Sequence, residues 1–415
     1  MIGAYPPPRR FDGPQLFPYH QLQLLSVLNK VHTQPDHFGL NMPDFVQFDL
    51  PALVDNFPLK AQRFDIPDGQ PHKAAVVICN ANGIPARFYR DFALWLTQHG
   101  VSVLTFDYRY LGLSWPPELA HLVGRGSTVK SRVQALRQVS EDVSVTTHWG
   151  ARDIAAAIRY AADRWKGVPL VAVGHSMGAI LLPLLGEERH LISRFLNVCA
   201  GNGFVGNYDD PCIVGEVLRE MVPLLEKERI WYTSRIGVGL ELPYGIGREI
   251  ADWIAHPRHS FLTESSQKAI RQVDKPYLAV GFEDDYTLSK MMLSKFLSQF
   301  SHADRQKSSL WVDPDAQRPP WAPCGHVMSF APSESFEPSE GAAPTPKREE
   351  TIWAVYLNWI LTETVDKTAG EYKIWGPEDE SNPLENEEWE YSFKDSEPFR
   401  RPRAGRKSDK PAPKL

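Results

Sequence analysis

The chain has 415 residues, of which 42% are hydrophobic and 23% are charged. This length and composition allow one large globular domain with extensions, or two smaller domains. The formal net charge of −6 excludes the strongly basic character typical of nucleic-acid-binding domains, so no nucleic-acid partner is expected. The four cysteines include no Cys-x-x-Cys pair, so neither a disulfide framework nor a zinc or redox motif is predicted.

The first 57 residues are interpreted as an N-terminal extension. They begin with a proline-rich stretch that lacks the apolar segment of a secretory signal. Apolar residues then recur at near-helical spacing, which predicts a short amphipathic helix at about 19–32.

From residue 58 to residue 363, short apolar runs alternate with segments of helical periodicity. Strands are predicted at 74–79, 101–106, 168–173, 195–199, 277–280 and 310–312, and helices at 87–99, 153–165 and 352–361. This alternation predicts an α/β domain with a mostly parallel sheet and helices on both faces.

Several segments interrupt the alternation. Residues 204–274 have helical stretches but no strong strand, and are predicted to form a helical cap. Residues 112–145 form a smaller insertion with a helix that carries Lys130, Arg132 and Arg137. Residues 331–347 are expected to form a flexible loop, and the aperiodic segment 364–415 is expected to be disordered.

A five-residue motif, Gly174-His175-Ser176-Met177-Gly178, lies between the predicted strand 168–173 and a following helix. A serine hydroxyl is a weak nucleophile until a neighbouring base takes its proton. A Gly-x-Ser-x-Gly turn between strand and helix presents such a serine, so Ser176 is the predicted nucleophile. The apolar run 168–186, which is long enough to mimic a membrane span, is explained by the same strand and helix.

The acid and base of a catalytic triad are expected after Ser176, in that order. The strand at 277–280 is followed by Gly281-Phe282-Glu283-Asp284-Asp285. Its register favours Asp284 as the acid, with Asp285 as the alternative. His326 follows the strand at 310–312 and is the predicted base.

The oxyanion of an acyl-transfer reaction needs two backbone N–H donors. One is expected from Met177, the residue after the nucleophile. The other is expected from the loop after the strand at 74–79. Asn82 is favoured for this second donor and Ala81 is the alternative.

These stretches resemble the α/β-hydrolase superfamily, and within it predicted serine hydrolases similar to serine aminopeptidases and monoacylglycerol lipases. The resemblance covers roughly residues 58–363. Besides the elbow, it is carried by Asn80 to Gly83 with Arg87-Phe88-Tyr89, Thr105 to Arg109, His148-Trp149 with Asp153, Leu242 to Gly245, and Gly325-His326.

The resemblance implies an eight-stranded sheet and a triad of Ser176, Asp284 and His326. The loop Asn80-Ala81-Asn82-Gly83 departs from the His-Gly of many relatives. The two long insertions depart as well, and these departures leave the substrate open.

An acyl hydrolase that cleaves an ester or thioester is the leading hypothesis, with a small apolar acyl substrate bound against cap aromatics (Trp231, Tyr232, Trp253 and Phe261). Acyl transfer, or a lyase or cyclisation step, with the same triad is the alternative, and a non-catalytic binding protein is a third reading. No cofactor, metal ion or integral membrane segment is expected. A cytoplasmic location is expected; the C-terminal Pro413-Lys414-Leu415 approaches a peroxisomal address and gives the alternative.

Overall fold

The computed structural model describes residues 45–124, 127–209, 211–236, 239–301, 306–332 and 346–380. The predicted helix at 19–32, most of the predicted loop 331–347, and the tail from 381 with its Pro-Lys-Leu end lie outside these residues. No helix within the described ranges has the length and apolar character needed to cross a membrane.

A nine-stranded sheet forms the centre of the structure, in the order β1-β2-β4-β3-β5-β6-β9-β10-β11. Its strands are β1 (Val46–Pro51), β2 (Pro58–Phe64), β3 (Ala74–Cys79), β4 (Val101–Phe106), β5 (Leu170–His175), β6 (Arg194–Val198), β9 (Tyr277–Phe282), β10 (Lys307–Val312) and β11 (Glu371–Ile374). The six strands from β4 to β10 run parallel, whereas β1, β2 and β11 join in antiparallel pairs at the two edges.

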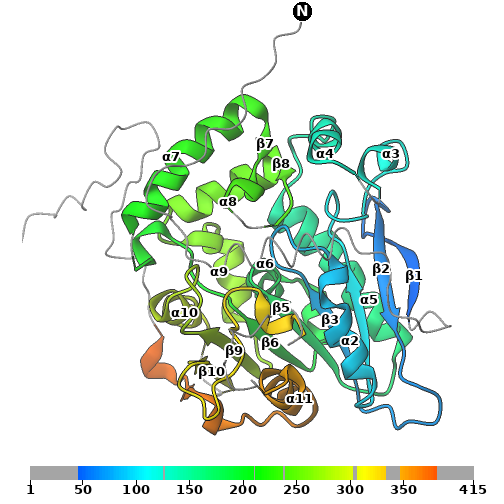
Figure 1. Cartoon of the computed structure of the whole chain (residues 1–415), viewed down its shortest axis with the longest axis vertical. Coiled ribbons are helices and arrows are strands. Elements are labelled where there is room, and N and C mark those ends of the chain that lie inside the picture. Colours follow the sequence, from blue (N-terminus) through cyan, green and yellow to red (C-terminus); the bar gives the residue numbers. More distant parts are fainter. Residues whose placement is uncertain are drawn as a thin grey trace, which may run out of the picture.

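Every residue of the six parallel strands is buried. Strands covered on both faces read as continuous apolar runs, which is why the sequence predicted all six to within a few residues. Helices α2 (Arg90–Thr97) and α11 (Ile352–Thr362) pack together through Phe92, Trp95 and Trp353. Helix α5 (Ala155–Arg164) covers the other face (Figure 1).

The sheet extends beyond the predicted domain at both ends, and it has nine strands instead of eight. Strand β1 lies in the predicted N-terminal extension and pairs with β2. Strand β11 pairs with β10, so the prediction of disorder is wrong for 364–380. The unpaired backbone of an edge strand explains the addition: Lys307 O accepts the N–H of Trp375, whose indole donates to Ser309 Oγ.

Two insertions gather above the carboxyl ends of the strands (Figure 1). The first contains α3 (Ala120–Val123), α4 (Val129–Leu136) and a π-helix, Val145–Ile154. The second contains α7 (Pro211–Glu228), α8 (Tyr244–Ala255), α9 (Glu264–Arg271) and a small sheet of β7 (Ile230–Trp231) with β8 (Leu242–Pro243). This small sheet was not predicted. Ile230 packs with Trp115, Leu119 and Leu136 in a separate apolar cluster, so the two insertions form one cap.

Helices α6 (Met177–Leu181) and α10 (Lys290–Leu297) follow β5 and β9. Because parallel strands end at the same edge of the sheet, the segments after β5, β9 and β10 meet there. These segments carry the serine, the acids and the histidine singled out in the sequence.

Candidate active site

Ser176 lies on a strained turn between β5 and α6. Its backbone has φ 50° and ψ −109°, a conformation that L residues rarely adopt. A Cβ on Gly174 would lie 2.5 Å from the Cα of Ala179, and one on Gly178 would overlap the carbonyl of Cys79. Glycine is therefore required at both positions for the serine to stand at the end of the strand.

A continuous hydrogen-bonded chain joins Ser176, His326 and Asp285. His326 Nε2 lies 2.8 Å from Ser176 Oγ, and His326 Nδ1 lies 2.8 Å from Asp285 Oδ2. A carboxylate can only accept, so Nδ1 carries the proton and Nε2 is left to accept from the serine hydroxyl. Burial acts to raise the pKa of Asp285, but the charge of His326 and the surrounding donors outweigh it and hold the pKa below its ordinary value.

The carboxyl partner of His326 is Asp285, the alternative, and the favoured Asp284 makes a different contact. Asp284 Oδ2 accepts the N–H of Cys324 at 2.9 Å, in the loop that leads to His326. Strand β9 continues two residues beyond its predicted end, to Phe282, and the turn that follows directs the two neighbouring acids differently. Burial raises the pKa of Asp284.

A second set of hydrogen bonds fixes the orientation of Asp285. Its Oδ1 accepts from Thr287 N at 2.8 Å, from Thr287 Oγ1 at 2.9 Å and from Leu288 N at 3.1 Å. This is the pattern of an Asx turn. With Oδ1 so occupied, Oδ2 is directed at the histidine.

The loop that carries His326 is held from below by a buried arginine that the sequence analysis did not single out. Arg348 donates to Ala322 O at 2.9 Å, to Cys324 Sγ at 3.1 Å and to Pro323 O. It lies just after the predicted flexible loop, and no local pattern in the sequence marks it as buried.

The two backbone donors expected for the oxyanion differ from their alternative. The N–H of Ala81 is already bonded to Tyr89 Oη at 2.9 Å. Within the described residues, the N–H groups of Met177 and Asn82 have no hydrogen-bond acceptor. Asn80 holds this loop against the elbow, because its carbonyl accepts from Gly178 N at 3.1 Å. The geometry therefore favours Asn82 over Ala81.

The cap contacts the oxyanion loop directly. Leu240 N donates to Gly83 O at 2.9 Å. Three of the four cap aromatics expected to line a pocket (Trp231, Trp253 and Phe261) are buried in the packing of cap on core, and Tyr232 is half-buried. For those three, packing is the observed role.

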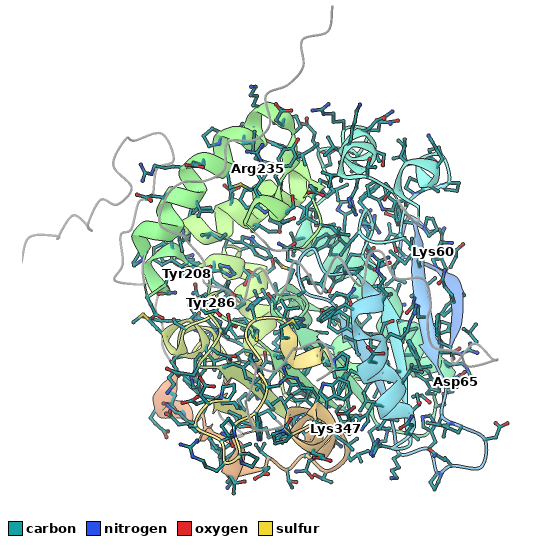
Figure 2. All side chains as sticks on the ribbon, in the orientation of Figure 1. Lys60, Asp65, Tyr208, Arg235, Tyr286 and Lys347 are labelled. Carbon is teal, nitrogen blue, oxygen red and sulfur yellow. The ribbon has the colours of Figure 1, made fainter. Side chains whose placement is uncertain are left out.

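Two tyrosines lie on the acid's side of the site. Tyr208 and Tyr286 are neighbours in Figure 2. Burial and the nearby Asp285 raise the pKa of Tyr208 to about 12, and burial with both acids raises that of Tyr286 to about 12. Both phenols therefore stay neutral in the pH range in which His326 has to act.

The thiol of Cys199 is also close to this chain. Its Sγ, an oxygen of Asp285 and a ring nitrogen of His326 lie within 4.8 Å of one another, and this is the group among the described residues that could hold a metal ion. Burial, with Asp285 nearby, raises the pKa of the Cys199 thiol. The same atoms of Asp285 and His326 are hydrogen-bonded to each other, so a metal would compete with the triad.

A parallel sheet with a strained Gly-x-Ser-x-Gly turn, and an acid and histidine after later strands, defines a class of α/β enzymes. The model of the alpha/beta hydrolase family matches residues 76–337. The chain therefore belongs to the alpha/beta hydrolase family. No curated protein matches the chain.

Solved structures with partial similarity include two hydrolases. A soluble variant of monoglyceride lipase from Saccharomyces cerevisiae, in complex with a substrate analogue, is 18% identical. The match has a TM-score of 0.46 and covers 68% of this chain and 90% of that one. Est1E from Butyrivibrio proteoclasticus, with bound ferulic acid, is also 18% identical, with a TM-score of 0.41, and the match covers 65% and 89%.

Proposed function

We propose that the chain is a serine hydrolase that cleaves an ester or thioester through an acyl-enzyme intermediate. The observation that carries this proposal is the hydrogen-bonded chain from Ser176 through His326 to Asp285, with 2.8 Å at both contacts. It joins a nucleophile, a base and an orienting carboxylate in the arrangement that acyl transfer requires.

In the first step, Ser176 Oγ attacks the carbonyl carbon while its proton moves to His326 Nε2. Asp285 keeps the imidazole in the tautomer that accepts this proton and stabilises the imidazolium that forms. His326 then donates the proton to the departing alcohol or thiol, which leaves the acyl group on Ser176. The reactive hydroxyl is half-buried, so a substrate can reach it from the cap side.

The oxyanion that develops in both steps is held by the N–H groups of Met177 and Asn82. Loss of one such donor typically costs about 3–4 kcal/mol of transition-state stabilisation. Water, activated by His326, then attacks the acyl-enzyme, and the same donors serve again as the acid is released.

We further propose that the acyl group is apolar and lies under the cap. The cap segment against the oxyanion loop contains Leu240 and Leu242, which are both buried. A contact of this kind places apolar side chains next to the carbonyl that Asn82 would bind. Acyl transfer to another acceptor uses the same residues and differs only in the second step.

Labelling with a fluorophosphonate probe tests the proposal. The wild-type chain and Ser265→Ala, a change of an exposed cap serine, are expected to label, and Ser176→Ala is expected not to label. A series of p-nitrophenyl esters of increasing chain length then measures the acyl preference. Equal labelling of all three proteins would contradict the proposal. Product analysis in water, with and without an alcohol acceptor, separates hydrolysis from acyl transfer.

A further inference from the structure

A second chain of buried hydrogen bonds runs behind the triad. Ala81 N–H donates to Tyr89 Oη at 2.9 Å, Tyr89 Oη lies 2.8 Å from His175 Nδ1, and His175 Nε2 lies 2.7 Å from the carbonyl oxygen of His326. Tyr89 and His175 are both fully buried. The chain therefore joins the oxyanion loop, the residue before the nucleophile and the backbone of the base.

The direction of every bond in this chain is determined. The carbonyl of His326 can only accept, so His175 Nε2 carries a proton. Burial, and then the charge of His326, lower the pKa of His175 to about 3, so the ring stays neutral and Nδ1 accepts. Tyr89 must then donate to Nδ1, and its oxygen accepts from Ala81.

The geometry assigns His175 and Tyr89 to a positioning role: together they set the oxyanion loop and the backbone of His326 in register with Ser176. Neither residue touches the reacting atoms. They act through Ala81, which adjoins the proposed donor Asn82, and through the main chain of His326. Because imprecision of about 1 Å at a reacting group can cost about a hundredfold in rate, a rigid link of this kind affects turnover more than substrate binding. This inference rests on the proposed function.

Three variants divide the chain at defined points. Tyr89→Phe keeps the ring, which packs edge-on to Phe330, and removes only the hydroxyl. His175→Asn places its amide where Nδ1 was and loses the contact with His326. His175→Gln places its amide near the position of Nε2 and loses the contact with Tyr89. Tyr277→Phe is the matched control, because it removes a buried hydroxyl that is bonded to Asn197.

The expected result is a decrease of kcat of about 10- to 100-fold in all three variants, with KM within about threefold of wild type. Affinity for a boronic acid transition-state analogue should fall by a similar factor. The double variant of Tyr89→Phe with His175→Gln should lose less than the product of the two single effects, because both changes break the same contact. Tyr277→Phe should change thermal stability without this loss of kcat.

Unchanged kcat in the variants, a kcat effect that Tyr277→Phe reproduces, or strictly multiplicative effects in the double variant would each overturn the inference. If the His175 variants do not fold, Tyr89→Phe and the analogue affinity carry the test. A wild-type chain without Ser176-dependent turnover would instead overturn the proposed function, so the two failures are distinguishable.

Discussion

Replacement of Asp285 by Asn is expected to abolish most of the activity by forcing His326 into the wrong tautomer. Three donors, from Thr287 and Leu288, point at Oδ1 of Asp285. An asparagine at this position keeps its single oxygen there. Its NH₂ group then occupies the position of Oδ2, 2.8 Å from His326 Nδ1, and His326 has to accept with Nδ1. The proton moves to Nε2, which can no longer take the proton of Ser176.

The size of the effect follows from the alternative orientation of the amide. Turning the oxygen toward His326 would restore the active tautomer but leave the three donors of the turn facing an NH₂ group. At about 1–2 kcal/mol for each unsatisfied buried donor, this orientation is about 3–6 kcal/mol less stable. Since 1.36 kcal/mol is a factor of ten, we expect kcat to fall by about 10²- to 10⁴-fold.

Asp284→Asn is the matched control, because it changes the neighbouring carboxyl and keeps an oxygen for Cys324 N. We expect its kcat to stay within about fivefold of wild type, since one neutral hydrogen bond replaces one charge-assisted hydrogen bond. The assay is steady-state hydrolysis of a p-nitrophenyl ester, with circular dichroism as the folding control. If Asp284→Asn lost more activity than Asp285→Asn, the assignment of the acid would be refuted.

Three further changes test other parts of the structure. Gly178→Ala should lower both Tm and activity sharply, because its Cβ overlaps the carbonyl of β3, whereas Gly186→Ala, whose nearest neighbour is 3.8 Å away, should leave both nearly unchanged. Burial lowers the pKa of His259 to about 3; its contribution to stability is present above pH 6.5 and is lost as the pH falls, so His259→Gln should reduce the slope of unfolding free energy between pH 6 and 4 by about 1.4 kcal/mol per pH unit in urea titrations. Asp153→Asn breaks the buried ion pair with Arg109, where Nη2 and Oδ1 lie 2.6 Å apart, and should cost about 3–5 kcal/mol of stability in the same urea titrations; a loss below 1 kcal/mol would contradict this reasoning.

The sequence predicted the central sheet because its strands are buried on both faces and read as apolar runs. Edge strands carry no such signal. Strand β11, with the sequence Glu371-Tyr372-Lys373-Ile374, has two exposed charged positions and is recruited because β10 has a free edge. Strand β1 is mostly exposed for the same reason. Pairing with an existing sheet decides such segments, and local propensity does not.

The candidate site was predictable to the extent that local patterns encode it. The elbow is local, since Gly174 to Gly178 contains all the steric requirements of the turn. The choice between the two acids was not resolved by the end of a strand, but a local signal was available: Asp285 stands two residues before Thr287, a spacing that favours an Asx turn. That turn occupies Oδ1 and leaves Oδ2 for the histidine.

The chain through Tyr89 and His175 had no comparable signal, because its members come from three segments that meet only in the folded sheet. Tyr89 is 86 residues from His175, and His175 is 151 residues from His326. Yet burial determines its chemistry, since a fully buried imidazole must stay neutral and needs a partner at each nitrogen. A histidine between an apolar strand and a nucleophile therefore indicates that two further groups converge on it, and the fold determines which groups these are.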